Sequence, residues 1–134
     1  MNSKEQILRK IAEAGMPPVD YPDFDFRPQR FADREAAFIR MVQAAGGKAI
    51  VADGRPLAEV VRQCYPEART IASILPEVQA TLDPDAVNDA RELCNVDLGV
   101  VSGRFGVAEN GAVWIRQDIR YKALYFAATD LVIV

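Results

Sequence analysis

From residue 33 onward, short apolar segments alternate with longer segments that repeat their apolar residues at helical spacing. Apolar runs at 48–52, 69–75 and 96–101 each follow such a segment. This alternation favours strands and helices in succession, because neighbouring parallel strands need a crossover connection between them. The chain is therefore predicted to form a layered α/β domain with a mostly parallel sheet, with further strands at 112–115 and 130–134.

The predicted helices, at 33–47, 53–66 and 83–94, have recognisable ends. Asp33 and Asp83 are candidate N-caps, and the Gly46-Gly47 pair suits the end of the first helix. Pro56 and Pro84 suit the first turns of the other two helices. The apolar positions of the middle helix have the spacing i, i+3, i+4 and i+7: Leu57, Val60, Val61 and Cys64.

Residues 1–32 are predicted to form an N-terminal helix and an extended arm outside the α/β domain of 33–134. The helix covers 3–15, with Ser3 and Gln6 as a capping box and Gly15 as its stop. The arm is rich in proline and aromatic residues, and either wraps the domain or contacts a ligand. Its aromatic residues are candidate anchors to the domain or to a second copy in a homodimer: Tyr21, Phe24 and Phe26.

The last strand, 130–134, has no helix after it to cover the sheet. Either the C-terminus is truncated, or another chain covers this strand, which also favours a homodimer. The length of 134 residues fits one domain. Its net charge of −3 gives no basic footprint for nucleic acid or an anionic membrane.

The chain has no histidine, which excludes Ser-His and Cys-His catalysis and histidine metal sites. Its two cysteines, Cys64 and Cys94, cannot complete a four-thiolate zinc or iron–sulfur site, and we expect buried thiols. No metal or cofactor is therefore expected in this chain. The absence of a signal-like or membrane-length apolar run predicts a cytoplasmic protein.

Residues 99–111, "GVVSGRFGVAENG", hold four glycines. Their spacing is not the dinucleotide-binding G-x-G-x-x-G, and the Gly-Lys-Ser/Thr ending of a P-loop is missing. Asn110-Gly111 predicts a tight turn. Glu109 beside it has apolar neighbours, and partial burial there would raise the pKa of the carboxyl and suit it to proton transfer. The alternative is that Glu109 caps backbone amides of nearby turns; the residues do not choose between the two.

The segment "VDLGVVSGRFGVAENGAVWI" resembles the LUD-domain family, which includes lactate utilization protein C. In that family a strand leads through a G-A-D-like stretch into an A-E-T-G-T-like motif and an apolar strand. The similarity covers about residues 96–134, with "LYFAATDLVIV" in place of the next strand. It implies a Rossmann-like three-layer α/β/α sandwich, similar to the sugar-phosphate isomerase, deaminase and CoA-transferase fold. It also implies a role in lactate or related organic-acid oxidation beside iron–sulfur partner proteins.

By position, Ala108, Glu109 and Gly111 match the family motif. Asn110 and Ala112 stand where the family usually has threonine, so two hydroxyl donors are missing. The Leu-Pro and histidine that usually precede the last strand are replaced by residues 127–130. Ser102-Gly103 matches the G-A-D-like stretch loosely and Arg104-Phe105 departs from it. The resulting candidate ligand-binding residues are Ser102, Gly103, Arg104, Gly106, Glu109, Asn110 and Gly111.

Three functions stay open. The first is an accessory, ligand-binding subunit in organic-acid oxidation, with its pocket at the carboxyl ends of the strands and iron–sulfur clusters only in its partners. Arg104, Arg116 or Arg120 would hold a carboxylate or phosphate. The second is a stand-alone enzyme of the isomerase or CoA-transferase type, with Glu109 as base or as the nucleophile of an acyl intermediate. The third is a degenerate interaction module.

Overall fold

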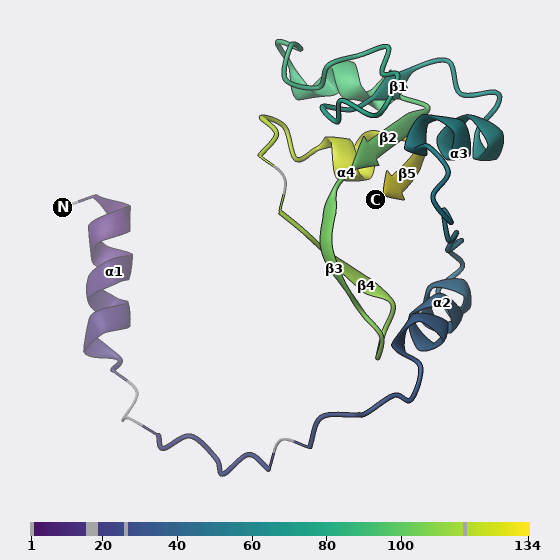
Figure 1. Cartoon of the computed structure of the whole chain (residues 1–134). Helices are drawn as coiled ribbons and strands as arrows, with labels where there is room; N and C mark the ends of the chain where they lie inside the picture. Colours follow the sequence, from purple (N-terminus) through teal and green to yellow (C-terminus); the bar gives the residue numbers. More distant parts are fainter. Residues whose placement is uncertain (1, 16–18, 26, 117) are drawn as a thin grey trace.

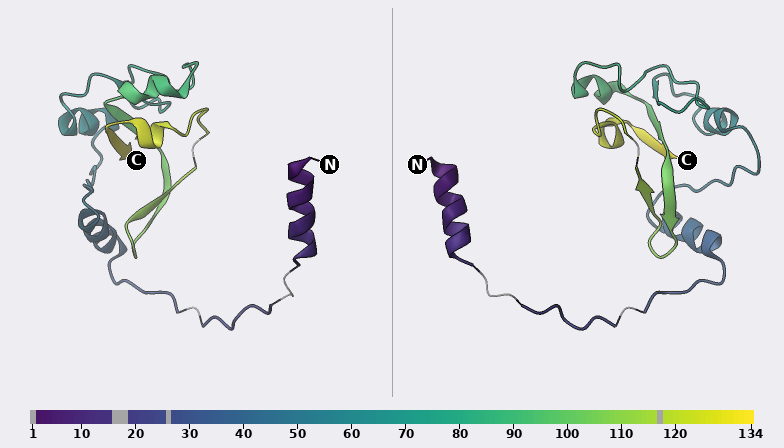
Figure 2. Two further views of the ribbon diagram at one scale, coloured as in Figure 1. Left: turned by 180° about the vertical axis from the view of Figure 1, so that it is seen from behind. Right: turned by 60° about the vertical axis from the view of Figure 1, so that its left-hand side comes forward.

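The computed structural model describes residues 2–15, 19–25, 27–116 and 118–134. Helix α1 (Ser3–Glu13) stands away from the rest of the molecule at the end of an extended arm (Figures 1 and 2). Every described residue of 2–25 is exposed. We call the described residues of 33–134 the body, and those of 19–32 the arm.

The body contains a small parallel sheet and a separate hairpin. Strands β1 (Ile71–Ala72), β2 (Leu98–Val101) and β5 (Asp130–Ile133) pair in the order β1-β2-β5, with both pairs parallel. Strands β3 (Gly103–Val107) and β4 (Ala112–Ile115) form an antiparallel pair. The structure is thus mixed α/β with a mostly parallel sheet, and β4 pairs with β3 rather than joining that sheet.

Strand β2 is the centre of the body, because all four of its residues are buried. Its alternating side chains face two apolar clusters. Leu98 and Val100 pack with Val61 of helix α3 (Leu57–Cys64). Val101 belongs to the second cluster, which includes Leu93 of the 3₁₀-helix η1 (Ala90–Asn95) and Leu124 of helix α4 (Leu124–Ala127). Helical segments therefore contribute to the packing on both sides of β2.

Asp97 ties β1 to β2. Its Oδ2 accepts hydrogen bonds from the backbone N–H groups of Arg69 and Thr70, each at 2.8 Å. These bonds stabilise the ionised carboxylate and hold the pKa of Asp97 below its usual range, with Thr70 as the largest contribution. The short strand β1 is thereby fixed at the start of its partner strand.

The predicted strand at 48–52 is wrong. These residues follow helix α2 (Arg34–Ala44) as an irregular segment in which Ile50 and Val51 are exposed. The outer edge of β1, where a further strand would pair, is occupied by the segment around Leu82, which forms a bridge with Ala72 and donates to the carbonyl of Ile71. An apolar run can become a strand of the sheet only where a sheet edge has unpaired backbone groups for it to pair with.

The predicted helix at 83–94 is also wrong in most of its length. Asp83 accepts a hydrogen bond from the N–H of Asp85 at 2.8 Å, which stabilises a local turn. Asp89 then acts as a second cap, with Glu92 completing a capping box, and η1 begins only at Ala90. Two competing caps within seven residues replace one long helix by turns and a 3₁₀-helix.

Two smaller predictions also need correction. The capping box of α1 is formed by Asn2 and Glu5, one residue before the predicted pair of Ser3 and Gln6, and the helix ends at the C-cap Ala14 rather than at Gly15. Cys64 and Cys94, expected as buried thiols, are free and exposed. Cys64 is the last residue of α3 and Cys94 is the last but one of η1, so both stand where their helical segments end.

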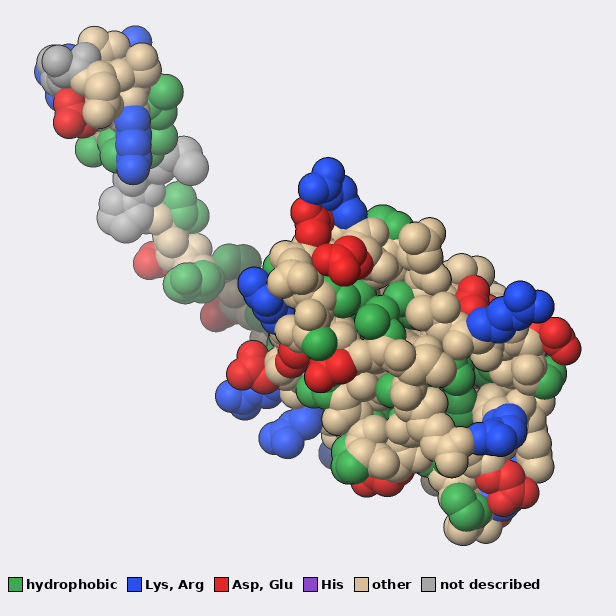
Figure 3. All heavy atoms as spheres, turned by 90° about the horizontal axis from the view of Figure 1, so that it is seen from above, with side chains coloured by type: hydrophobic (Ala, Val, Ile, Leu, Met, Phe, Trp, Pro, Cys, Tyr) green, Lys and Arg blue, Asp and Glu red, His purple; other side chains and the backbone are tan. Residues whose placement is uncertain are grey.

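Acidic and basic side chains are interspersed on the face of the molecule seen in Figure 3, rather than gathered by sign. None of the helices in the described part of the chain has both the length and the apolar character needed to cross a membrane.

Candidate functional site

The glycine-rich segment of 99–111 spans β2, β3 and the tip of the hairpin. The tip loop, 108–111, closes by a hydrogen bond from the N–H of Gly111 to the carbonyl of Val107 at 2.9 Å. Gly111 has a φ of 72°, which favours glycine, and Asn110 Oδ1 accepts from the N–H of Ala112 at 2.9 Å. The predicted Asn-Gly turn is confirmed.

Two of the glycines allow the hairpin to approach α2. A Cβ on Gly106 would lie 2.7 Å from the ring of Phe38, and one on Gly111 would lie 2.8 Å from the backbone nitrogen of Val42. Both distances are too short for a side chain. Close packing between the hairpin and α2 therefore accounts for these two glycines.

Glu109 lies at the exposed tip of the hairpin. The burial that would suit its carboxylate to proton transfer is therefore absent. It borders an open hollow of about 570 Å³ between the arm and the hairpin, whose polar lining also includes Arg27, Gln29 and Arg34. Arg27 donates to Asp25 at 2.8 Å. The catalytic hypothesis for Glu109 stays a prediction, and loss of turnover in a Glu109→Gln variant is its test.

A second hollow, of about 460 Å³, lies beside the first, on the α2 side of β3. Phe38, Val113 and Ile133 give it an apolar lining, and Arg34 and Arg104 also line it. Glu35 lines it as well. The second hollow is also lined by Gly103, which comes shortly after β2, and by Ile133 and Val134 at the end of β5. It therefore lies at the carboxyl ends of these two parallel strands.

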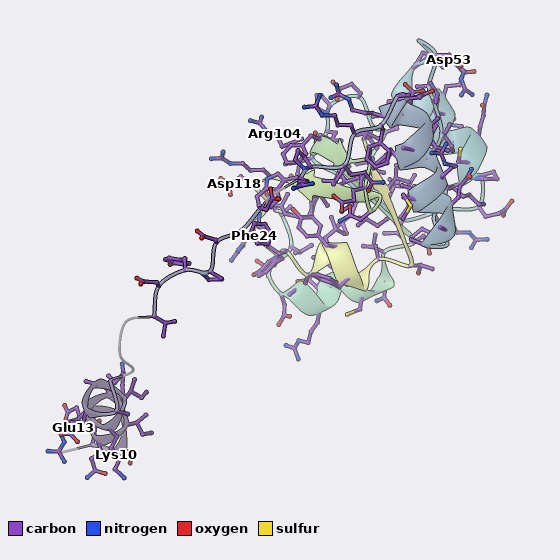
Figure 4. All side chains as sticks on the ribbon, turned by 90° about the horizontal axis from the view of Figure 1, so that it is seen from below. Lys10, Glu13, Phe24, Asp53, Arg104 and Asp118 are labelled. Carbon is purple, nitrogen blue, oxygen red and sulfur yellow. The ribbon has the colours of Figure 1, made fainter. Side chains whose placement is uncertain are left out.

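The structure divides the predicted ligand-binding residues between the two ends of the hairpin. Ser102 and Gly103 lie at its base, where the N–H of Gly103 donates to the carbonyl of Val134 at 2.6 Å. Arg104 lies beside them, on the side of the body that the arm leaves (Figure 4). Gly106 lines both hollows, and the remaining predicted residues are at the tip: Glu109, Asn110 and Gly111.

Of the other arginines considered from the sequence, Arg120 has a structural role. Its backbone N–H donates to Asp85 at 2.7 Å, its guanidinium donates to the carbonyl of Val87 at 3.3 Å, and it lies 5.0 Å from the ring centroid of Tyr121. Arg116 is exposed and follows β4. Neither residue lines the two hollows.

Sequence reasoning missed Arg34, which lines both hollows. The signal for it was available only in part. Asp33, the predicted N-cap, places Arg34 in the first turn of a helix. The structure confirms the cap, since Asp33 accepts a hydrogen bond from the N–H of Ala36 at 2.9 Å. Nothing in the residue pattern shows that this turn lies against the hairpin.

No group of three or more histidine, cysteine or acidic side chains suited to a metal ion occurs among the described residues. Comparison of the chain with family models, curated proteins and solved structures finds no match in any of the three. The site must therefore be judged from its own geometry.

Proposed function

We propose that this chain is a LUD-like accessory domain that binds a small organic acid and acts with iron–sulfur oxidoreductase partners in lactate or related organic-acid utilization, in the cytoplasm. The observation that carries the ligand-binding part is the second hollow. Apolar side chains and two arginines, Arg34 and Arg104, line it at the carboxyl ends of parallel strands, which is where open α/β sheets bind ligands.

Arg34 and Arg104 are the residues we assign to the carboxylate of the ligand. A guanidinium binds a carboxylate by charge-assisted, two-point hydrogen bonding. Among the described residues, neither arginine forms an ion pair within the chain. Glu109 lines the adjoining hollow, where it would accept a hydrogen bond from a hydroxyl of a ligand that extends into it, whereas Ser102 and Asn110 line neither hollow.

We propose that the body of this chain has a Rossmann-like three-layer α/β/α arrangement. Helical segments contribute to the packing on both sides of β2, with α3 in one cluster and η1 and α4 in the other. This supports the proposal, since a doubly covered parallel sheet is the basis of that architecture.

Titration of the full-length protein with lactate, and with a panel of other organic acids, tests the binding proposal. We expect Arg34→Ala and Arg104→Ala each to weaken binding about tenfold or more, since a hydrogen bond to a charged group contributes about 1.5–3 kcal/mol. Arg40→Ala is the matched control, an exposed arginine on the same helix α2 that lines neither hollow. Equal affinity in all three variants, or binding of no acid, would overturn the proposal.

The partnership needs a separate measurement, because ligand binding does not depend on it. We expect the purified chain to form a complex with an iron–sulfur oxidoreductase subunit of the same organic-acid pathway. Light scattering of the two mixed proteins would detect it as a mass equal to the sum of the two chains.

A second function, that of an interaction module, is favoured by the exposed pair of Phe105 and Trp114 on the hairpin. Binding of no acid, sugar phosphate or CoA ester would favour it.

A further inference from the structure

The outward face of the hairpin carries an exposed aromatic pair. Phe105 and Trp114 are opposite each other in the register, their rings are parallel within 1°, and the ring centroids lie 6.3 Å apart. Each residue is 58% exposed. The opposite side of the hairpin packs on α2 through Gly106, and Phe105 also borders the two hollows at the edge of β3.

The arm carries the complementary composition. Val19, Tyr21 and Phe24 are 85%, 98% and 81% exposed, and Pro22 stands between the two aromatic residues. An extended proline-containing segment has little conformational freedom left to lose, and aromatic surfaces recognise such segments for this reason. The aromatic side chains of the arm and of the hairpin therefore suit one another as binding partners.

The charges of the two surfaces are also complementary. Residues 19–25 contain three aspartates and no basic residue, whereas the exposed Arg116 follows Trp114 by two positions at the end of β4. Asp25 is paired with Arg27 at 2.7 Å, which leaves Asp20 and Asp23 as the acidic groups closest to the aromatic residues of the arm. Opposite charges at the rim of an aromatic contact favour its orientation.

Residues 19–25 of the arm are directed away from the hairpin of their own chain. Arg27, Pro28, Gln29 and Phe31 line the hollow beside Phe105, and toward the N-terminus the chain runs outward from the body (Figure 2). Arg27-Pro28 stands between the hollow and residues 19–25 on this outward path. A residue before proline favours extended backbone, which opposes a reversal there.

We propose that residues 19–25 of one copy dock on the Phe105–Trp114 face of a second copy, so that the chain forms a dimer by reciprocal exchange of arms. Each contact would bring together four aromatic side chains. Two such contacts would bury on the order of 1,000 Å², given about 150 Å² for each aromatic residue. That area reaches the size of a small specific interface.

Trp114 is the single tryptophan of the chain, so its fluorescence reports on the proposed contact directly. For the full-length protein we expect the mass in solution to rise with concentration from 14.8 kDa to twice that value. The Trp114 emission should shift to the blue over the same concentration range. The double variant Tyr21→Ser/Phe24→Ser leaves the body unchanged and should remove both effects.

Phe126→Ala is the control, because Phe126 is 89% exposed on α4 and takes no part in the proposed contact. It should associate as the wild type does. Four results would overturn the proposal: a monomer at every concentration, a dimer whose Trp114 emission does not change, blue-shifted emission independent of concentration, or a dimer that survives the Tyr21→Ser/Phe24→Ser change. The third of these would show that the arm covers its own hairpin.

Discussion

Helices α1 and α3 are both amphipathic, yet they form for different reasons. Helix α1 has a complete capping box, and its Ile7, Leu8 and Ile11 are all more than half exposed. Helix α3 has no side-chain cap, but its Val60 and Val61 are buried. The first is stabilised by local interactions and the second by packing against the sheet. An amphipathic pattern thus indicates which face of a helix can be buried, and does not show whether it is buried.

This difference has an energetic consequence. An isolated helix of 11 residues is marginal in water, because the cost of nucleation is recovered over few hydrogen bonds. Helix α3 has only eight residues, and its stability comes from the cluster it shares with Leu98 and Val100. The following experiments separate local from tertiary stabilisation, in order of decreasing effect.

The largest contrast is expected between two identical substitutions. Leu98→Ala creates a cavity at a fully buried position of β2 and should lower the free energy of unfolding of the body by about 2–5 kcal/mol. Leu8→Ala, at a position in α1 that is 55% exposed, should change it by less than about 0.5 kcal/mol. Denaturant unfolding measures both. Similar losses in the two variants would show that α1 is packed against the body.

The helix caps give a contrast of intermediate size. Asp33→Ala removes the side-chain acceptor at the start of α2 and should cost the body about 1 kcal/mol. Asn2→Ala removes the equivalent acceptor in α1, where Asn2 Oδ1 binds the N–H of Glu5 at 2.9 Å. It should lower the helix content of residues 3–13, measured by NMR chemical shifts, and leave the unfolding midpoint of the body unchanged. A shift of that midpoint would contradict the separation of the two regions.

The smallest expected effect depends on pH and belongs to the body alone. The folded structure lowers the pKa of Asp97, so the ionised carboxylate stabilises the fold at pH values above its unfolded pKa. This contribution is lost as the pH falls through the lower, folded pKa. Acid unfolding followed by fluorescence should therefore show a shallower pH dependence in Asp97→Asn than in the wild type. An identical profile would show that ionisation of the Asp97 carboxyl contributes no pH-dependent stability.

Much of the fold could be predicted where one local signal dominates. Asp33 marked the start of α2, the spacing of Val60 and Val61 marked the buried face of α3, and the apolar segments at β2, β4 and β5 were recognised as strands. Strand β3 was not predicted, because Gly103 and Gly106 suggest a bend. Their role depends on Val113 and Phe38, which come close only in the folded structure.

The candidate site could be predicted less well than the fold. The sequence indicates Glu109 through its neighbouring Asn-Gly turn, but the exposure of Glu109 depends on how far the hairpin projects from the sheet. Arg34 and Arg104 are 70 positions apart in the sequence and line one hollow only because the hairpin folds onto α2. The residue pattern of one segment does not show which distant segment it will contact in the folded structure.

The position of β2 between β1 and β5 also determines the order in which the body can assemble. Leu98 pairs with Ile71 on one side and with Asp130 on the other, about thirty residues away in each direction, whereas Val107 and Ala112 of the hairpin are joined by a four-residue loop. Short loops close within microseconds, while distant pairings must first overcome a larger entropy of closure. The hairpin is therefore the part of the sheet structure that can form first, and we expect refolding to be limited by the pairing of the two remote strands with β2.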